Sequence, residues 1–252
     1  MSQRPTIVGP GRRLDVELPS VAENLALDEA LLAEAHDGHR SGVVVRTWMA
    51  AEPTVVLGSS SHVELEVDLE ACAAAGVTVV RRPTGGLTVV LGPGCLMWSV
   101  VVAWPGPLPA IEAVHAALLD PLAAAIRAAG RPVERSGTSD LSIATPDGLR
   151  KVSGNALRVR RQAVLYHGTL LDQFDIELVG RVLRHPPREP AYRAGRDHAS
   201  FLANLHLGRD RLQGAVHDAF AAHEPAAGWP REQVADLVRC RYGSPAWTHR
   251  LQ

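Results

Sequence analysis

The stretch from Gly148 to Arg161, GLRKVSGNALRVRR, holds the only lysine of the chain. The other 25 of the 26 lysines and arginines are arginines, so a plain surface charge would be expected to be arginine here. Lysine differs from arginine in presenting a compact ammonium rather than a broad planar guanidinium. Such a point charge can lie beside a carbonyl or phosphoryl oxygen that becomes more negative in a transition state. Lys151 is therefore a candidate catalytic residue, and the alternative is a solvated surface charge.

A second segment able to do polar chemistry is RRPTGGLTVVLGPG, from Arg81 to Gly94. Two arginines end a predicted strand, and Gly85 and Gly86 allow the backbone to approach a ligand closely. Exposed N–H groups beside a guanidinium can hold a phosphate or a carboxylate. A Gly-Gly pair after a strand is also an ordinary turn, so this segment alone leaves both interpretations open.

The third candidate is His167, which precedes Gly168 in LYHGTLLD. It can face the same cleft, although a lone histidine in a strand is more often structural. The sequence has no GxSxG nucleophile elbow, no HExxH zinc motif and no GxxxxGK[ST] phosphate loop. The HDGH run at residues 36–39 offers only a weak pair of metal ligands.

The elements that must position these residues are short β-branched runs bounded by glycine or proline, which predict closely spaced strands. Ser20 and Glu23 have the spacing of a capping box at the start of a helix. A second helical pattern, 110–130, contains Pro121, which predicts a kink or a break. Helices and strands follow no regular βαβ rhythm, so we predict an α+β fold with a mixed or antiparallel sheet flanked by helices. The predicted strands are 42–48, 54–60, 77–83, 87–92, 95–104, 140–144, 150–158 and 162–172, and later helices are 176–185, 199–205, 209–223 and 231–243.

Composition excludes several classes of protein. The chain has 252 residues, of which 46% are hydrophobic, and a formal net charge of −1, so nothing favours nucleic acid or an acidic membrane as a partner. No apolar run of 18 residues and no signal-peptide pattern is present, which predicts no membrane span and a cytoplasmic location. The three cysteines, Cys72, Cys95 and Cys240, form no CxxC pair, so neither a disulfide framework nor a zinc site is indicated.

Taken together and in order, five blocks resemble the lipoate–protein ligase family, which shares its fold with biotin–protein ligases and octanoyltransferases. The blocks are NLALDEALL (24–32), RRPTGG (81–86), SDL (139–141), RKVSGNALR (150–158) and YHGTLL (166–171). The resemblance implies the ligase catalytic-domain fold, with a mixed sheet and a cleft for an acyl-adenylate. We expect a single catalytic domain over 1–252, with its core at about 14–205, a helical C-terminal extension at 206–252 and no large accessory domain.

The resemblance also implies a reaction in two steps. Lipoate and ATP with Mg²⁺ give lipoyl-AMP and pyrophosphate, and the lipoyl group then passes to a lysine of a carrier domain. Lys151 matches the family lysine that holds the carboxylate and phosphate oxygens through both steps. Asp140 matches the acidic residue near the adenine and the metal, which makes it the implied Mg²⁺ ligand. The implied substrate- and adenylate-binding residues are Arg82, Thr84, Gly85, Gly86, Asp140, Gly154, Asn155, His167 and Thr169.

The sequence departs from the ligase pattern at three positions. Leu87 stands where the family usually has a third glycine, Thr84 replaces a serine, and Ser139 replaces an asparagine before the aspartate. The RRPTGG form is closer to some octanoyltransferase relatives. Expected partners are a lipoyl carrier domain or a protein like the H protein of glycine cleavage. Because only about 45 residues follow position 205, an accessory ligase subunit is a further possible partner.

Three other functions stay open on the sequence. Octanoyltransferase relatives use a cysteine nucleophile that forms an acyl thioester. This chain has no cysteine between positions 96 and 239, and Cys95 starts an apolar strand as a buried small residue, which favours adenylate chemistry. The alternatives are an octanoyl or lipoyl transferase acting from a carrier protein without ATP, or a non-catalytic lipoyl-binding homologue. Biotin ligation ranks lower, because that family has a differently patterned glycine loop.

Overall fold

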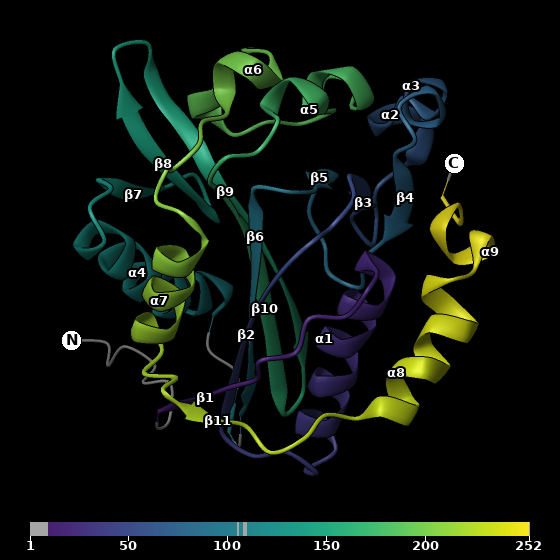
Figure 1. Ribbon diagram of the computed structural model, residues 1–252, viewed down its shortest axis with the longest axis vertical. Coiled ribbons are helices and arrows are strands. Elements are labelled where there is room, and N and C mark those ends of the chain that lie inside the picture. The colour runs from purple at the N-terminus through teal and green to yellow at the C-terminus, as the bar shows by residue number, and fades with distance from the viewer. Residues whose placement is uncertain (1–9, 105, 108–109, 252) are drawn as a thin grey trace.

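The computed structural model describes residues 10–104, 106–107 and 110–251, and Figure 1 shows two β-sheets with helices packed around them. The strands are β1 (Gly11–Arg13), β2 (Val43–Met49), β3 (Thr54–Leu57), β4 (Thr78–Arg81), β5 (Val89–Leu91), β6 (Cys95–Ala103), β7 (Val133–Ser136), β8 (Asp140–Thr145), β9 (Gly148–Arg160), β10 (Ala163–Leu171) and β11 (Glu224–Pro225). The helices are α1 (Val21–His36), α2 (Val63–Glu66), α3 (Leu69–Ala74), α4 (Ile111–Ala128), α5 (Ile176–Val182), η1 (Ala191–Arg193), α6 (His198–Phe201), α7 (Arg209–Ala219), α8 (Arg231–Leu237), η2 (Val238–Tyr242) and α9 (Pro245–Thr248).

The larger sheet has the strand order β11-β1-β2-β6-β10-β9-β8-β7, and the smaller one has the order β4-β3-β5. The long neighbours β2, β6, β10 and β9 run antiparallel, whereas β1 is parallel to β2 and β11, and β3 is parallel to β4. The predicted α+β fold with a mixed sheet flanked by helices is therefore confirmed.

Alternating side chains of β6 explain why both faces of the large sheet are covered. Cys95 and Met97 belong to the core cluster that contains α1, whereas Leu96, Trp98 and Val100 belong to the cluster that contains α4 and α7. Successive side chains of a strand point to opposite faces, so an uninterrupted apolar strand needs a hydrophobic partner on each side. Figure 1 shows α1 on one side of the sheet and α4 with α7 on the other.

Helix α1 begins with the predicted capping box. The Ser20 hydroxyl accepts from the backbone N–H of Glu23, and the Glu23 carboxylate accepts from the backbone N–H of Ser20. We expect Ser20→Ala to lower the free energy of unfolding by about 1 kcal/mol, because it removes one of these two bonds. Ser20→Gly should cost only a few tenths of that, since glycine is tolerated at this position. Urea denaturation measures both, and equal losses in the two variants would contradict a capping role.

Several predicted elements differ from the structure. Helix α4 runs through Pro121 from Ile111 to Ala128, so the predicted break is wrong. The helix predicted over 199–205 is the shorter α6, and the strands β1, β7 and β11 were not predicted. The segment 206–252 contains α7, α8, η2 and α9 but also β11, which pairs with β1. Within the described part of the chain, no helix is long and apolar enough to cross a membrane.

Candidate active site

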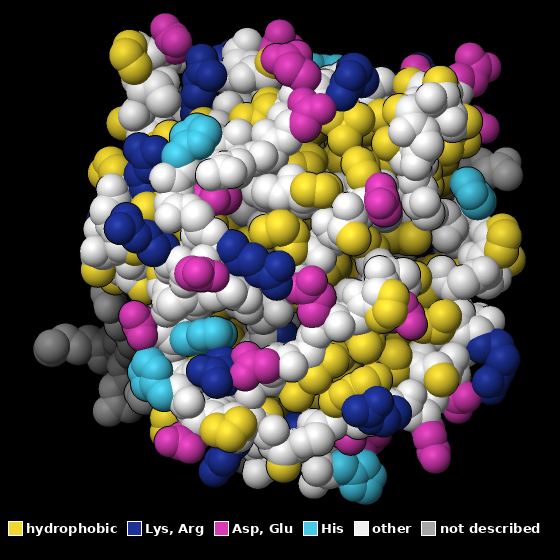
Figure 2. All heavy atoms as spheres, in the orientation of Figure 1, with side chains coloured by type: hydrophobic (Ala, Val, Ile, Leu, Met, Phe, Trp, Pro, Cys, Tyr) yellow, Lys and Arg dark blue, Asp and Glu magenta, His cyan; other side chains and the backbone are white. Residues whose placement is uncertain are grey.

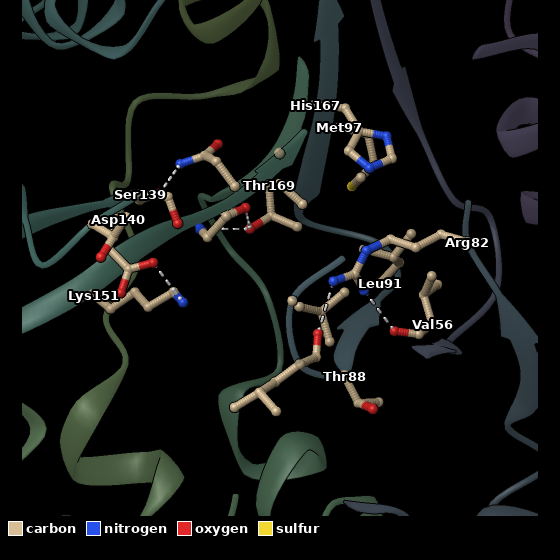
Figure 3. A pocket seen from close by; sticks show the side chains of 18 of the residues that line it. Val56, Arg82, Thr88, Leu91, Met97, Ser139, Asp140, Lys151, His167 and Thr169 are labelled. Atoms are coloured by element: carbon tan, nitrogen blue, oxygen red, sulfur yellow. Dashed lines mark hydrogen bonds and ion pairs between the residues drawn. The ribbon is translucent and has the colours of Figure 1, made fainter. Parts of the chain in front are cut away.

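A cavity of about 410 Å³ lies between the loop after β4 and the strands β8, β9 and β10. Figure 3 shows Lys151 and Asp140 on one side of it and Arg82 on the other. It brings together most of the predicted site residues, whereas Thr84 and Gly85 are not among its lining residues. The predicted site residues that line it are Arg82, Gly86, Asp140, Lys151, Gly154, Asn155, His167 and Thr169.

Lys151 reaches this cavity because strand β9 is irregular at that point. Asp140 pairs with Gly154, but the register with β8 shifts at Leu141 and Ser142, so that Ser142 pairs with Lys151 and Val152 is skipped. Without the shift, Lys151 and Gly154 would point to opposite faces of the strand, since they are three residues apart. A bulge of this kind re-aims a side chain, and here it turns Lys151 towards the cavity.

The ammonium of Lys151 is tied to an acidic partner. Its Nζ lies 2.8 Å from Oδ1 of Asp140, and the hydroxyl of Tyr192 donates to Oδ2 of the same carboxylate at 2.8 Å. Burial, followed by the nearby Asp140 charge, raises the pKa of Tyr192, so the phenol stays a donor. A Cβ on Gly154 would lie 2.7 Å from Cε and 2.8 Å from Nζ of Lys151. The glycine three residues after the lysine therefore leaves room for the lysine side chain.

The guanidinium of Arg82 is used mainly to hold the loop that follows it. Nη2 donates to the carbonyls of Gly85 at 2.6 Å and Leu87 at 2.9 Å, and Nη1 donates to the carbonyl of Val56 at 3.0 Å. Nε donates to the hydroxyl of Thr84 at 3.0 Å. Burial lowers the pKa of Arg82 to about 10, so the group remains charged near neutral pH. Three of these four bonds hold the loop and the fourth holds strand β3, and residues of the loop line the cavity.

The comparison with protein families decides the relationship. The model of the lipoyl protein ligase A/B catalytic domain matches residues 20–221. The chain belongs to this family. The octanoyltransferase LipM of Carboxydothermus hydrogenoformans is 34% identical over 220 residues, which cover 81% of this chain and 76% of that protein. The LipM of Symbiobacterium thermophilum is 32% identical over 274 residues, covering 95% of this chain and 98% of that protein.

Solved structures of the family share the fold. The bipartite lipoate protein ligase of Thermoplasma acidophilum, studied with its E2 lipoyl domain, has a TM-score of 0.82 at 23% identity and covers 96% of this chain and 97% of that one. A lipoate-protein ligase A bound with ATP has a TM-score of 0.80 at 22% identity, covering 97% of this chain and all of that one. The predicted ligase-like catalytic fold is therefore confirmed.

The cavity of this family member also has apolar walls. Leu25 of α1, Val56 of β3, Leu91 of β5 and Met97 of β6 line it, and the space-filling view shows hydrophobic side chains gathered around the small sheet (Figure 2). A second cavity of about 130 Å³ shares Lys151 and further residues with the first. Its apolar lining includes Phe174, Val179, Leu183, Phe201 and Leu202. An apolar tail can therefore lie close to the ammonium.

The loop after α5 supplies lining residues that sequence reasoning missed. Arg188, Glu189 and Pro190 line the large cavity, and Tyr192 bonds to Asp140. The sequence marked this segment only as an irregular loop, and no motif distinguishes these residues. Their position depends on how the loop folds back over β8 and β9.

The described residues contain no cluster of three or more His, Cys, Asp or Glu that could hold a metal. Magnesium, however, is often bound by one or two carboxylates together with water and substrate phosphates. Asp140 and Glu189 line the same cavity and fit that requirement. Because Asp140 already binds Lys151 and Tyr192, its role as a Mg²⁺ ligand stays a prediction.

None of the three cysteines, all of which the structure describes, lines either cavity. Cys95 is completely buried in β6, and burial raises the pKa of its thiol to about 12. Cys72 is buried in α3, where burial and then Asp68 raise its pKa. Cys240 is exposed in η2. Because the thiolate is the nucleophile, the two buried thiols are poorly suited to covalent catalysis.

Proposed function

We propose that the protein transfers a medium-chain acyl group, octanoyl or lipoyl, to a lysine amine of a lipoyl carrier domain, and that it first activates the free acid with ATP. The observation that carries this proposal is a cavity that holds a lysine ammonium on one side and the glycine loop, the turn at Gly85 and Gly86 after β4, on the other, with no thiol in its walls. An enzyme that has no nucleophile at the site needs an activated acyl donor, and an acyl-adenylate is such a donor.

In the first step, an oxygen of the acyl carboxylate attacks the α-phosphorus of ATP, and pyrophosphate leaves. Two negatively charged groups must approach each other, and the ammonium of Lys151 lowers the cost of that approach. In the second step, the carrier amine attacks the acyl carbonyl, AMP leaves, and the nitrogen loses a proton. The same ammonium can stabilise the negative charge that develops on the oxygens in both steps. The apolar walls would hold the acyl tail.

A second candidate is octanoyl transfer from a carrier protein without ATP. Four relatives bear the name octanoyltransferase LipM, and two of them match over more than nine tenths of this chain, which favours this reaction more directly than the ligase reaction. Since no cysteine lies at the cavity, the acceptor lysine would then attack the donor thioester directly, with Lys151 beside the carbonyl oxygen.

The two reactions differ in their donors. A purified lipoyl domain is incubated with the protein and either octanoate or lipoate plus ATP and Mg²⁺, or octanoyl-carrier protein without ATP, and its mass is measured. We expect acylation of the lipoyl domain with the free acid and ATP. Acylation with the octanoyl-carrier protein alone would establish the second candidate instead. Absence of acylation from both donors would favour the non-catalytic homologue.

A variant without cysteines provides a further prediction. We expect the combined Cys72→Ala, Cys95→Ala and Cys240→Ala variant to keep acyl transfer within about threefold, because none of the thiols reaches the cavity. Loss of the buried sulfurs should lower stability by about 1 kcal/mol at each of the two buried sites, which thermal melting will show. A variant that remains folded but loses all transfer would revive the thioester route.

A further inference from the structure

We infer that Asp28, which lies outside both cavities, is a positioning residue of the active site. Its buried carboxylate sets the tautomer of His167, and through His167 and Thr84 it sets the orientation of the Arg82 guanidinium, which shapes the glycine loop. The geometric part of this inference stands on the hydrogen bonds themselves. Its kinetic part rests on the proposed acyl transfer.

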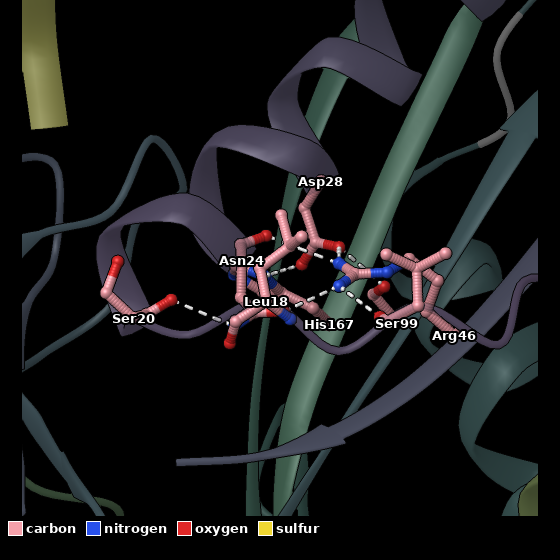
Figure 4. A network of polar contacts seen from close by, with 8 residues as sticks. Leu18, Ser20, Asn24, Asp28, Arg46, Ser99 and His167 are labelled. Carbon is pink, nitrogen blue, oxygen red and sulfur yellow. Dashed lines mark hydrogen bonds and ion pairs between the residues drawn. The ribbon is translucent and has the colours of Figure 1, made fainter. Parts of the chain in front are cut away.

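The chain of contacts begins on α1, as Figure 4 shows. Oδ1 of Asp28 accepts from Nη1 of Arg46 and, at 2.8 Å, from the hydroxyl of Ser99. Oδ2 lies 3.4 Å from Nδ1 of His167, and Nε2 of that ring lies 2.7 Å from the hydroxyl oxygen of Thr84. All five side chains are buried, with exposures between 0% and 3%. Water therefore competes little for these bonds.

The directions of these hydrogen bonds follow from the two charged groups at the ends and from the need to satisfy the buried hydroxyl of Thr84 between them. Burial raises the pKa of Asp28, but Arg46, followed by His167 and Ser99, brings it below its ordinary value, so the carboxylate is ionised and only accepts. At the other end, Nε of Arg82 can only donate to Thr84. Among the hydrogen bonds of the described residues, Nε2 of His167 is the acceptor available to the buried Thr84 hydroxyl, so the hydroxyl hydrogen is satisfied when it donates to Nε2; Nδ1–H of the ring then donates to Asp28. The partners thus select the neutral Nδ1–H tautomer.

This series of hydrogen bonds ends at the loop that covers the cavity. Arg82 binds the carbonyls of Gly85 and Leu87, so its orientation fixes the path of the loop backbone. The far end of the loop has a separate anchor, because Oε2 of the buried Glu66 accepts from both the backbone N–H and the hydroxyl of Thr88 at 2.8 Å. Loss of the Thr84 hydroxyl therefore removes one of the four side-chain bonds that orient the Arg82 guanidinium, while Glu66 still holds the far end of the loop.

The tautomer can be tested on the wild-type protein without any substrate. Nitrogen chemical shifts of ¹⁵N-histidine-labelled protein report which ring nitrogen carries the proton, and His167→Gln assigns the signal by its disappearance. We expect His167 to be neutral with the proton on Nδ1. A protonated Nε2, in a neutral or a charged ring, would overturn the inference. The nitrogen chemical shifts report the tautomer even if the protein accepts neither acyl donor as a substrate.

The kinetic test uses Thr84→Val, which keeps the shape of the side chain and removes the hydroxyl. We expect kcat for acyl transfer to fall about 10- to 100-fold, as a small misplacement of an active-site loop can cause. The octanoate dissociation constant should change less than threefold, because the apolar walls remain. Thr84→Ser should restore kcat. The matched control Thr54→Val removes a buried hydroxyl on β3, away from both cavities, and should leave kcat unchanged.

Asp28→Asn tests whether the two ends act together. If Asp28 and Thr84 act through the same series of hydrogen bonds, the double variant Asp28→Asn with Thr84→Val should have a kcat no lower than that of the slower single variant. Multiplied losses would overturn the inference. Asp28→Asn removes the negative charge that pairs with the buried Arg46 and can therefore prevent folding. In that case the tautomer measurement and the Thr84 variants decide the question. If the wild-type protein is inactive with both donors, the proposed function is wrong. The NMR measurement of the His167 tautomer still tests the geometric part of the inference separately.

Discussion

Lys151→Arg should lower kcat/KM for acyl transfer by at least about 100-fold while the protein remains folded, a loss typical of removing one group that stabilises developing charge. Arginine keeps the positive charge, so the expected loss of kcat/KM comes from the different shape of the guanidinium group. The ammonium lies 2.8 Å from Asp140 and close over the backbone of Gly154. A guanidinium is planar, broader and strongly directional, and it cannot occupy the same space beside Gly154 without moving the strand.

The matched control is the reverse exchange one residue earlier. Arg150 lies on the same strand, pairs with the exposed Asp147 at 3.3 Å and lines neither cavity. Arg150→Lys should change kcat/KM less than twofold, since exposed pairs of this kind contribute little. Steady-state kinetics with a lipoyl domain as acceptor measures both variants. Wild-type activity in Lys151→Arg would remove the catalytic role assigned to this lysine.

Gly58→Ala is the second variant with a large expected effect. A Cβ at this position would lie 1.8 Å from the carbonyl oxygen and 2.9 Å from the carbonyl carbon of Gly86. Both are backbone atoms, so the glycine loop must move to make room. We expect acyl transfer to fall about 100-fold, and the free energy of unfolding to fall by about 1 to 3 kcal/mol because the site is overpacked.

A control for this exchange is Gly214→Ala. Gly214 lies in α7, and a Cβ there would meet nothing within 4 Å. The substitution should raise stability by up to about 1 kcal/mol, because alanine is favoured inside helices, and it should leave acyl transfer unchanged. Chemical denaturation and the transfer assay are run on both proteins. Unchanged activity in Gly58→Ala would mean that the position of Gly86 does not matter for the reaction.

The elements with strong local patterns could be predicted from the sequence. The capping box of Ser20 and Glu23 marks the start of α1, and the β-branched runs mark β2, β6 and β10. Eight of the residues that the five family blocks assigned to the site line the cavity. Lys151 was recognisable because it is the only lysine in an arginine-rich chain.

Long-range contacts could not be predicted in this way. Thr84 meets His167 across 83 positions of sequence, and Asp28 meets it across 139. The family resemblance assigned Thr84 to ligand binding, which stays a prediction. The structure shows Thr84 buried and absent from the lining of the cavity, and the sequence gave Asp28 no role. The turn of Lys151 towards the cavity depends on a register shift between β8 and β9, which leaves no local signal in the residues themselves. Tertiary packing decides such features.

The most direct test of the account is whether the protein forms an acyl-adenylate. Wild-type protein and the cysteine-free variant are incubated with octanoate, ATP and Mg²⁺, and octanoyl-AMP is measured by mass spectrometry together with released pyrophosphate. We predict both products, in equal amounts, from both proteins. The absence of octanoyl-AMP, together with an octanoyl thioester on a cysteine of the wild-type protein after exposure to octanoyl-carrier protein, would contradict the account.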